Sequence, residues 1–204
     1  LEKYNADIVQ CLFRNVFVND SFDRKYKIKG NYPKVLTSKR FLKEYLYDWK
    51  YAIFWNKLFK SSLLKEIRFP VGRKIDEFFT YKLVCNSKKI VNLEDVLYSY
   101  RMRKTSVMNE NDTDRLIYDR IDCFVERYDY IRKKYPSLYK KYLTKLYDSL
   151  LYYKTQVNNT EKLEKYISKI QKPKINKIDK INEIMRYKKL LDDSYDQSNK
   201  IKYE

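Results

Sequence analysis

Two adjacent carboxylates, Asp76 and Glu77, are the residues of this sequence best suited to acid–base chemistry. They open the stretch DEFFTYKLVCN, whose apolar spacing predicts a helix over residues 76–86, so both acids stand in its first turn. A carboxylate there can take a proton from a substrate. The helix dipole also stabilises acids in a first turn by about 0.3–1 kcal/mol. The pair alone leaves both interpretations open.

Histidine is absent from the chain. Its absence excludes Ser-His-Asp and Cys-His catalysis and the usual zinc sites, so a general base must be Asp, Glu, Lys or Tyr. The three cysteines, Cys11, Cys85 and Cys123, stand far apart in apolar surroundings. This usage predicts reduced, buried thiols in a cytoplasmic protein.

The composition predicts a soluble, folded protein of one or two domains, with 204 residues, 44% apolar and 35% charged. No stretch approaches the ~20 continuous apolar residues of a membrane-spanning helix. The net charge of +18 favours phosphate-bearing partners, whether nucleic acids, nucleotide sugars or anionic lipid headgroups. A solubilising lysine coat explains the same charge. Nucleic acid is an unfavoured partner, because the many tyrosines share the general bias of the composition.

The first part of the chain has a mixed α/β pattern. β-Branched and aromatic residues over 6–18 predict one or two strands, and a helix is expected from Thr37 or Ser38, either of which can cap it. Two more elements are predicted: a capped two-turn helix over 61–67, and a strand, a turn and a second strand over KKIVNLEDVLYSYRMR.

The second part has apolar residues at helical spacings of three and four. They predict helices over 112–133 and 143–157, a third helix from Thr160 and a fourth over 178–185. Such stripes are typical of a helical-bundle core. The predicted fold is therefore predominantly helical, with an α/β segment over 1–109 and an all-α extension over 110–204.

An ordered set of motifs over residues 54–109 resembles the second half of the catalytic domain of family-two glycosyltransferases. The set comprises WNKL, then FP with a following Gly, an acidic pair before FFTYKL, and then KKIV, LYSYRMR and TSVMN. The family consists of inverting enzymes of GT-A fold that build bacterial capsule, lipopolysaccharide and cell-wall glycans. The resemblance extends more weakly to NADIVQC near the N-terminus.

The resemblance implies that Asp76 is the general base that deprotonates an acceptor hydroxyl, which then attacks the anomeric carbon of a nucleotide sugar. Asp76 and Phe79 match the family pattern Glu-Asp-x-x-Phe, whereas Ile75 stands where the family has Glu. Glu77 is the substitute candidate for the missing acid, although it points about 100° away on a helix.

The same resemblance implies roles for five further residues. Arg101 and Arg103 match a segment that closes over the donor diphosphate, with Met102 in place of a Gln. Guanidinium groups suit bidentate contact with phosphate oxygens, although alternate residues on a strand also describe one solvated edge. Acceptor-binding residues are expected at Trp55, Asn56 and Lys57. The indole either stacks on an acceptor sugar or fills core, and Lys57 lies either near the site or on the surface.

The family also needs an N-terminal half that binds the nucleotide and holds Mg²⁺ or Mn²⁺ on an Asp-x-Asp motif. We find no counterpart here, so the sequence is expected to be an acceptor half cut from a longer enzyme, without a metal of its own and inactive alone. The expected partners are a nucleotide sugar, a glycan or lipid-linked acceptor, and the anionic inner face of the membrane.

Two other functions remain open on the sequence. One is a non-catalytic basic module that binds polyanions or nucleic acid. The other is a helical scaffold that forms oligomers through residues 110–204.

Overall fold

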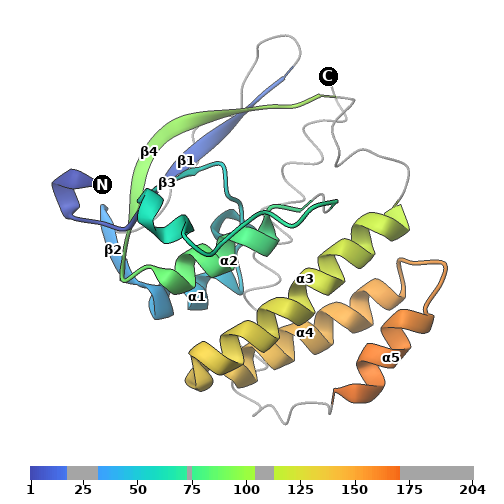
Figure 1. Ribbon diagram of the computed structural model, residues 1–204. Helices are drawn as coiled ribbons and strands as arrows, with labels where there is room; N and C mark the ends of the chain where they lie inside the picture. The colour runs from blue at the N-terminus through green and yellow to red at the C-terminus, as the bar shows by residue number, and fades with distance from the viewer. Residues whose placement is uncertain (18–31, 73–74, 104–112, 171–204) are drawn as a thin grey trace.

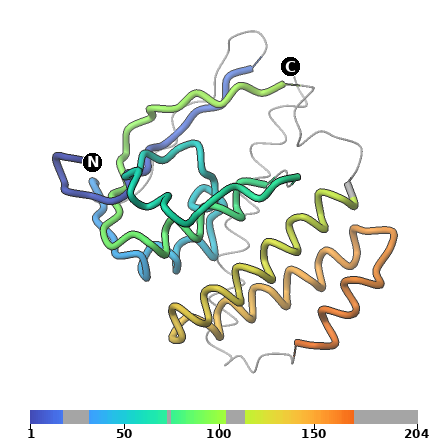
Figure 2. Tube along the Cα trace, in the orientation of Figure 1, coloured from blue at the N-terminus to red at the C-terminus, as the bar shows by residue number. Residues whose placement is uncertain are grey.

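The computed structural model describes residues 1–17, 32–72, 75–103 and 113–170, and combines a small mixed sheet with a layer of helices (Figure 1). Figure 2 traces the same path from the N-terminal strands to the helices at the end of the described chain. The mixed α/β character predicted from the sequence is therefore confirmed.

The sheet has four strands in the order β2-β4-β1-β3. Its two central strands, β1 and β4, run parallel, and both outer strands are antiparallel to their neighbours. The strands are β1 (Ile8–Val16), β2 (Lys34–Thr37), β3 (Lys57–Phe59) and β4 (Lys89–Arg101).

The strand, turn and second strand predicted over residues 88–103 are wrong, because β4 is one continuous strand from Lys89 to Arg101. Asn92 pairs with Gln10 and Val96 pairs with Leu12, so three residues of β4 stand opposite one residue of β1. Such a bulge takes up extra residues without ending the ladder. The polar residues between Asn92 and Asp95, which resemble a turn in the sequence, therefore lie inside a strand.

Helices flank the sheet and continue beyond it. The α-helices are α1 (Ser38–Tyr45), α2 (Glu77–Asn86), α3 (Thr113–Lys134), α4 (Tyr139–Lys154) and α5 (Glu161–Lys169), and the 3-10 turns are η1 (Glu2–Tyr4), η2 (Trp49–Tyr51), η3 (Ser61–Leu64) and η5 (Pro136–Leu138). No helix within the described ranges is long and apolar enough to cross a membrane.

Local sequence signals predicted most helix starts. Thr37 caps α1, since its Oγ1 accepts the N–H of Arg40 at 3.3 Å. The two-turn helix predicted over 61–67 is wrong: only the four-residue η3 forms there. Lys60 occupies its cap position, and a lysine side chain has no acceptor for the first N–H groups. The fourth predicted C-terminal helix lies outside the described residues.

Two apolar clusters hold the helices. The larger cluster joins the sheet, α1 and α2 to part of the helical layer, through residues such as Ile8 and Ile90 on the strands and Cys123 and Ile131 on α3. The smaller cluster lies among α3, α4 and α5 and is made by Ile121, Leu146, Leu150 and Leu163.

Arg127 on α3 makes a buried polar connection between the layers, beside the pair of Lys82 and Glu126. Its Nη1 lies 3.2 Å from Oε2 of Glu77, the first residue of α2, and only 6% of the arginine side chain is exposed. The guanidinium also lies over the rings of Phe124 at 4.5 Å and Tyr45 at 5.0 Å. Burial disfavours its charge, but Tyr45 and Glu77 together hold the pKa of Arg127 above its ordinary value.

Replacing Arg127 with Met should lower the free energy of unfolding by about 3–5 kcal/mol, because Glu77, whose side chain is only 19% exposed, is left without its cation. Urea titration followed by circular dichroism measures the change. The matched control is Arg132→Met on the same helix, where the half-exposed pair with Asp129 predicts a change within about 0.5 kcal/mol. Equal losses in the two variants would contradict a special role for Arg127.

Candidate functional site

Asp76 stands at the N-cap position of α2 and is held by the loop before β3. Its Oδ2 accepts the backbone N–H of Phe54 at 2.8 Å, while its side chain makes no capping bond to the helix. Because only two residues separate the end of α2 from the start of β4, the N-terminus of α2 lies toward the end of the sheet where β1 and β4 finish (Figure 1). Asp76 is partly buried, so its carboxylate is both fixed and reachable.

Glu77 points elsewhere. Its carboxylate pairs with Arg127, so it belongs to the contact between α2 and α3. The two neighbouring acids that the sequence predicted as catalytic candidates are therefore not brought together: the Asp76 side chain bonds to the loop at Phe54, and the Glu77 side chain bonds to the helical layer.

Asn56 and Lys57 lie behind this loop as a bonded pair. Asn56 is buried and donates its Nδ2 to the carbonyl of Cys11 on β1 at 3.1 Å. Its Oδ1 accepts from Nζ of Lys57 at 3.0 Å, and the same ammonium donates to the carbonyl of Ile53. These bonds anchor the loop to the sheet, and they direct both side chains inward.

The ammonium of Lys57 is desolvated. Burial lowers the pKa of Lys57 to about 7, although attraction to nearby carboxylates, Asp76 first among them, acts in the opposite direction. Lys57 is thus close enough to Asp76 to influence it electrostatically, and near neutral pH it exists in both protonation states.

Trp55 forms part of an aromatic cluster on the sheet. Its indole stacks on Tyr98 and Tyr100 of β4, with ring centroids 4.5 Å and 4.9 Å away. Phe13 packs edge-on against Trp55 at 4.7 Å and against Trp49 at 5.7 Å. Since Trp49 is 55% exposed, the cluster continues to the molecular surface. Trp55 therefore packs against other rings, as a core residue does, and belongs to a cluster that is also open to a ligand at the surface.

Arg101 and Arg103 are exposed at the far end of β4. Arg101 pairs with Val16, the last residue of β1, and the N–H of Met102 bonds to the carbonyl of Val16 at 2.8 Å. The two arginines therefore follow the end of the parallel strands. The residues 104–109 that complete this motif lie outside the described ranges.

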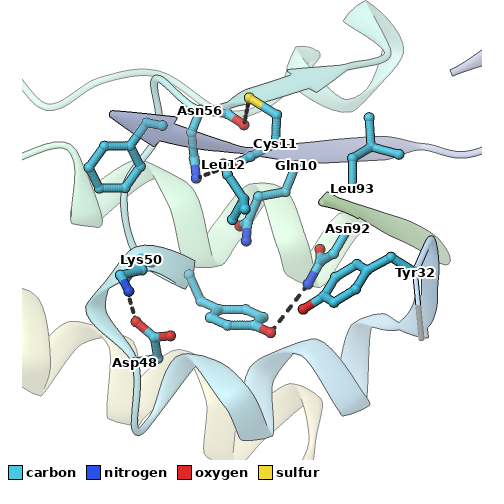
Figure 3. A pocket seen from close by; sticks show the side chains of 11 residues that line it. Gln10, Cys11, Leu12, Tyr32, Asp48, Lys50, Asn56, Asn92 and Leu93 are labelled. Carbon is cyan, nitrogen blue, oxygen red and sulfur yellow. Dashed lines mark hydrogen bonds between the residues drawn. The ribbon is translucent and has the colours of Figure 1, made fainter. Parts of the chain in front are cut away.

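Sequence reasoning missed a polar cavity under the sheet (Figure 3). Its volume is about 120 Å³. The signal was present, because strand alternation puts Gln10 on the same face as the buried Ile8 and Leu12, where an amide is out of place. Asn92 is its neighbour across β4.

No group of three or more His, Cys, Asp or Glu that could hold a metal ion occurs within the described ranges. These residues therefore do not fit the divalent metal of the family-two enzymes, and we derive no catalytic step through a metal from them.

No protein-family model matches the chain. The chain is 32% identical over 74 residues to Glycosyltransferase GlyA of Streptococcus pneumoniae serotype 4. The match covers 36% of this chain and spans only 10% of the length of that protein. Part of the chain is therefore related to a glycosyltransferase.

The pKa of Lys57 predicts a pH-dependent stability. Between the folded value of about 7 and the ordinary lysine value of about 10.4, the unfolded chain binds more protons, so the free energy of unfolding rises with pH. Below pH 7 both states are protonated, and this contribution becomes constant. Relative to Lys57→Met, the wild type should gain about 2 kcal/mol between pH ~7 and ~9, measured by urea unfolding.

The control for this experiment is Lys165→Met, which removes an exposed lysine of α5 paired with Glu161. Its pH profile should follow the wild type. If Lys57→Met also follows the wild type, the ammonium of Lys57 is solvated and the argument from burial is wrong.

Proposed function

We propose that this chain is the acceptor half of a GT-A glycosyltransferase that transfers a sugar, with inversion, from a nucleotide-sugar donor to a glycan or lipid-linked acceptor. The similarity to Glycosyltransferase GlyA supports the reaction class. The motif resemblance over residues 54–109 supports the fold type and stereochemistry, and points to a hexose as the transferred unit.

The observation that carries the proposal is the geometry of Asp76. One carboxylate oxygen, Oδ2, is fixed by the N–H of Phe54, which leaves Oδ1 without a donor among the described residues. An acceptor hydroxyl that bonds to Oδ1 can give up its proton there as its oxygen attacks the anomeric carbon. The bond from that carbon to the diphosphate breaks in the same displacement, and the diphosphate leaves with the electron pair.

The neighbouring residues have supporting roles in this proposal. Exposed Trp49 and Tyr98, together with the edge of Trp55, offer aromatic surface on which the apolar face of an acceptor sugar can stack. Arg101 and Arg103 supply positive charge that stabilises the leaving diphosphate. Asn56 and Lys57 act from behind the loop, as anchors of the backbone that holds Asp76.

The donor site and its Mg²⁺ or Mn²⁺ are assigned in this proposal to sequence beyond the described residues. The net charge of +18 supports contact with the anionic inner face of the cell membrane, where capsule, lipopolysaccharide and cell-wall glycans are assembled on lipid carriers. We therefore place the protein in the cytoplasm, at the periphery of that membrane.

Asp76→Asn in the complete gene product should lower kcat for sugar transfer by about 10²–10⁴-fold, because the amide cannot accept the proton. The amide oxygen still accepts the N–H of Phe54, so the fold should be retained. Transfer from a panel of radiolabelled nucleotide sugars to membrane lipid extract measures the effect. The matched control is Asp129→Asn, a half-exposed acid of α3 that should keep full activity.

Two outcomes would contradict the proposal. Unchanged kcat in folded Asp76→Asn would remove Asp76 as the base. Absence of transfer by the wild-type gene product with every nucleotide sugar and Mg²⁺ or Mn²⁺ would remove the transferase function itself.

A further inference from the structure

The polar cavity under the sheet is built from segments distant in sequence. In Figure 3 the side chains of Gln10 on β1 and Asn92 on β4 point toward the segment that carries Asp48 and Lys50. The complete lining comprises Gln10, Cys11, Leu12, Phe13, Tyr32, Asp48, Lys50, Tyr51, Asn56, Asn92 and Leu93. None of the catalytic residues proposed above is among them, apart from the anchoring Asn56.

Two acceptors in this cavity have no partner within the described protein. They are Oε1 of Gln10 and Oδ1 of Asn92, whose residues are only 6% and 4% exposed. The Nδ2 of Asn92 is used, since it donates to the hydroxyl of Tyr51 at 3.3 Å. An unpaired buried polar group costs about 1–3 kcal/mol. Gln10 and Asn92 pair directly across β1 and β4, so the two unpaired amide oxygens come from neighbouring positions. A ligand that donates hydrogen bonds to both oxygens would remove both penalties.

The charges around the cavity disfavour an anionic ligand. Burial first, and then the carboxylates of Asp48, Glu94 and Glu44, raise the pKa of Tyr32. Burial and two of the same carboxylates, Glu44 and Asp48, also raise the pKa of Tyr51. The lining itself carries one acid, Asp48, and one base, Lys50, so the cavity offers no concentration of positive charge for an anion. Since the described residues form no cluster suited to a divalent metal, a neutral donor-rich ligand fits best.

The size and the aromatic surroundings favour one sugar ring. A volume of about 120 Å³ holds about four water molecules, which is room for the hydroxyl-bearing edge of a ring and too little for a disaccharide. Phe13 lines the cavity and packs against Trp49, which is 55% exposed beside the lining residues Asp48 and Lys50. An amide-lined cavity next to an open indole matches the two faces of a sugar, one of hydroxyls and one of C–H groups.

We propose that this cavity is a subsite for one neutral sugar unit, whose hydroxyls donate to Oε1 of Gln10 and Oδ1 of Asn92 while its apolar face rests on Trp49. The inference rests on the proposed function in one respect, which is that the bound sugar belongs to the acceptor. The loop 53–57 joins the two places, because Asn56 lines the cavity and the N–H of Phe54 holds Asp76.

The test is saturation-transfer NMR on the whole chain with glucose, galactose and N-acetylglucosamine at millimolar concentration, with glucose 6-phosphate as the anionic comparison. At least one neutral sugar should receive saturation, and the phosphorylated sugar should bind at least several-fold more weakly. If none of the neutral sugars receives saturation from the protein, the cavity holds only water and the proposal is overturned. Equal or tighter binding of glucose 6-phosphate also overturns it.

The decisive variants are Gln10→Leu and Asn92→Leu, which remove the unpaired acceptors. Each should weaken sugar binding at least tenfold while leaving the thermal midpoint unchanged or higher, because a buried amide without a partner is replaced by an apolar group. The matched control is Gln156→Leu, an exposed glutamine after α4, which should bind sugar as the wild type does. Wild-type affinity in folded Gln10→Leu overturns the subsite.

Trp49→Ala tests the subsite without changing a residue of the sheet, because the Trp49 side chain lies outside the strands and is largely exposed. It should weaken sugar binding several-fold, whereas Tyr152→Ala, an exposed aromatic of α4, should not. Loss of sugar binding in Tyr152→Ala as well would overturn the assignment to this cavity. If the complete gene product transfers sugar but no neutral sugar binds in this cavity, the subsite alone is overturned. If a neutral sugar binds in the cavity but the gene product transfers no sugar, the proposed function alone is overturned.

Discussion

The contact between Arg127 and Glu77 is the constraint on which the arrangement of this molecule depends. It places a buried positive charge between the helical layer and the first residue of α2, where rings of Tyr45, Phe124 and Tyr142 surround it. A buried cation is tolerated only when a carboxylate and hydrogen-bond acceptors compensate for its lost hydration. The helical layer therefore cannot shift along α2 without separating the pair.

This constraint reaches the candidate site through one peptide unit. Glu77 is fixed to α3, so the preceding residue, Asp76, is fixed in turn at the entrance to α2, where its carboxylate meets the N–H of Phe54. The loop that supplies this N–H is held from behind by Asn56 and Lys57. A carboxylate with one oxygen fixed by a backbone N–H needs little reorganisation to accept a proton at the other, which is the role proposed for Asp76.

The site also accepts local costs that a purely structural core avoids. Lys57 is desolvated enough for its pKa to fall to about 7, and two amide oxygens under the sheet lack partners among the residues that the structure describes. Apolar residues of similar size would remove both penalties. Natural proteins keep such features mainly where a ligand or a reaction uses them, because stability is otherwise gained easily by replacing them.

The sequence by itself determined the local features of this protein: the start of α1 after Thr37, the presence of α2, α3 and α4 with α4 displaced by a few residues from its predicted range, and the two acids at one helix start. Capping and apolar periodicity act within a few residues, so they can be read from neighbouring letters. Only the tertiary structure decided which acid faces the loop and which meets Arg127, fifty residues away. Only the tertiary structure also showed that β4 continues through its polar residues and that Gln10 pairs with Asn92. These outcomes depend on strand register and helix packing between distant segments, and such contacts leave no mark in local spacing.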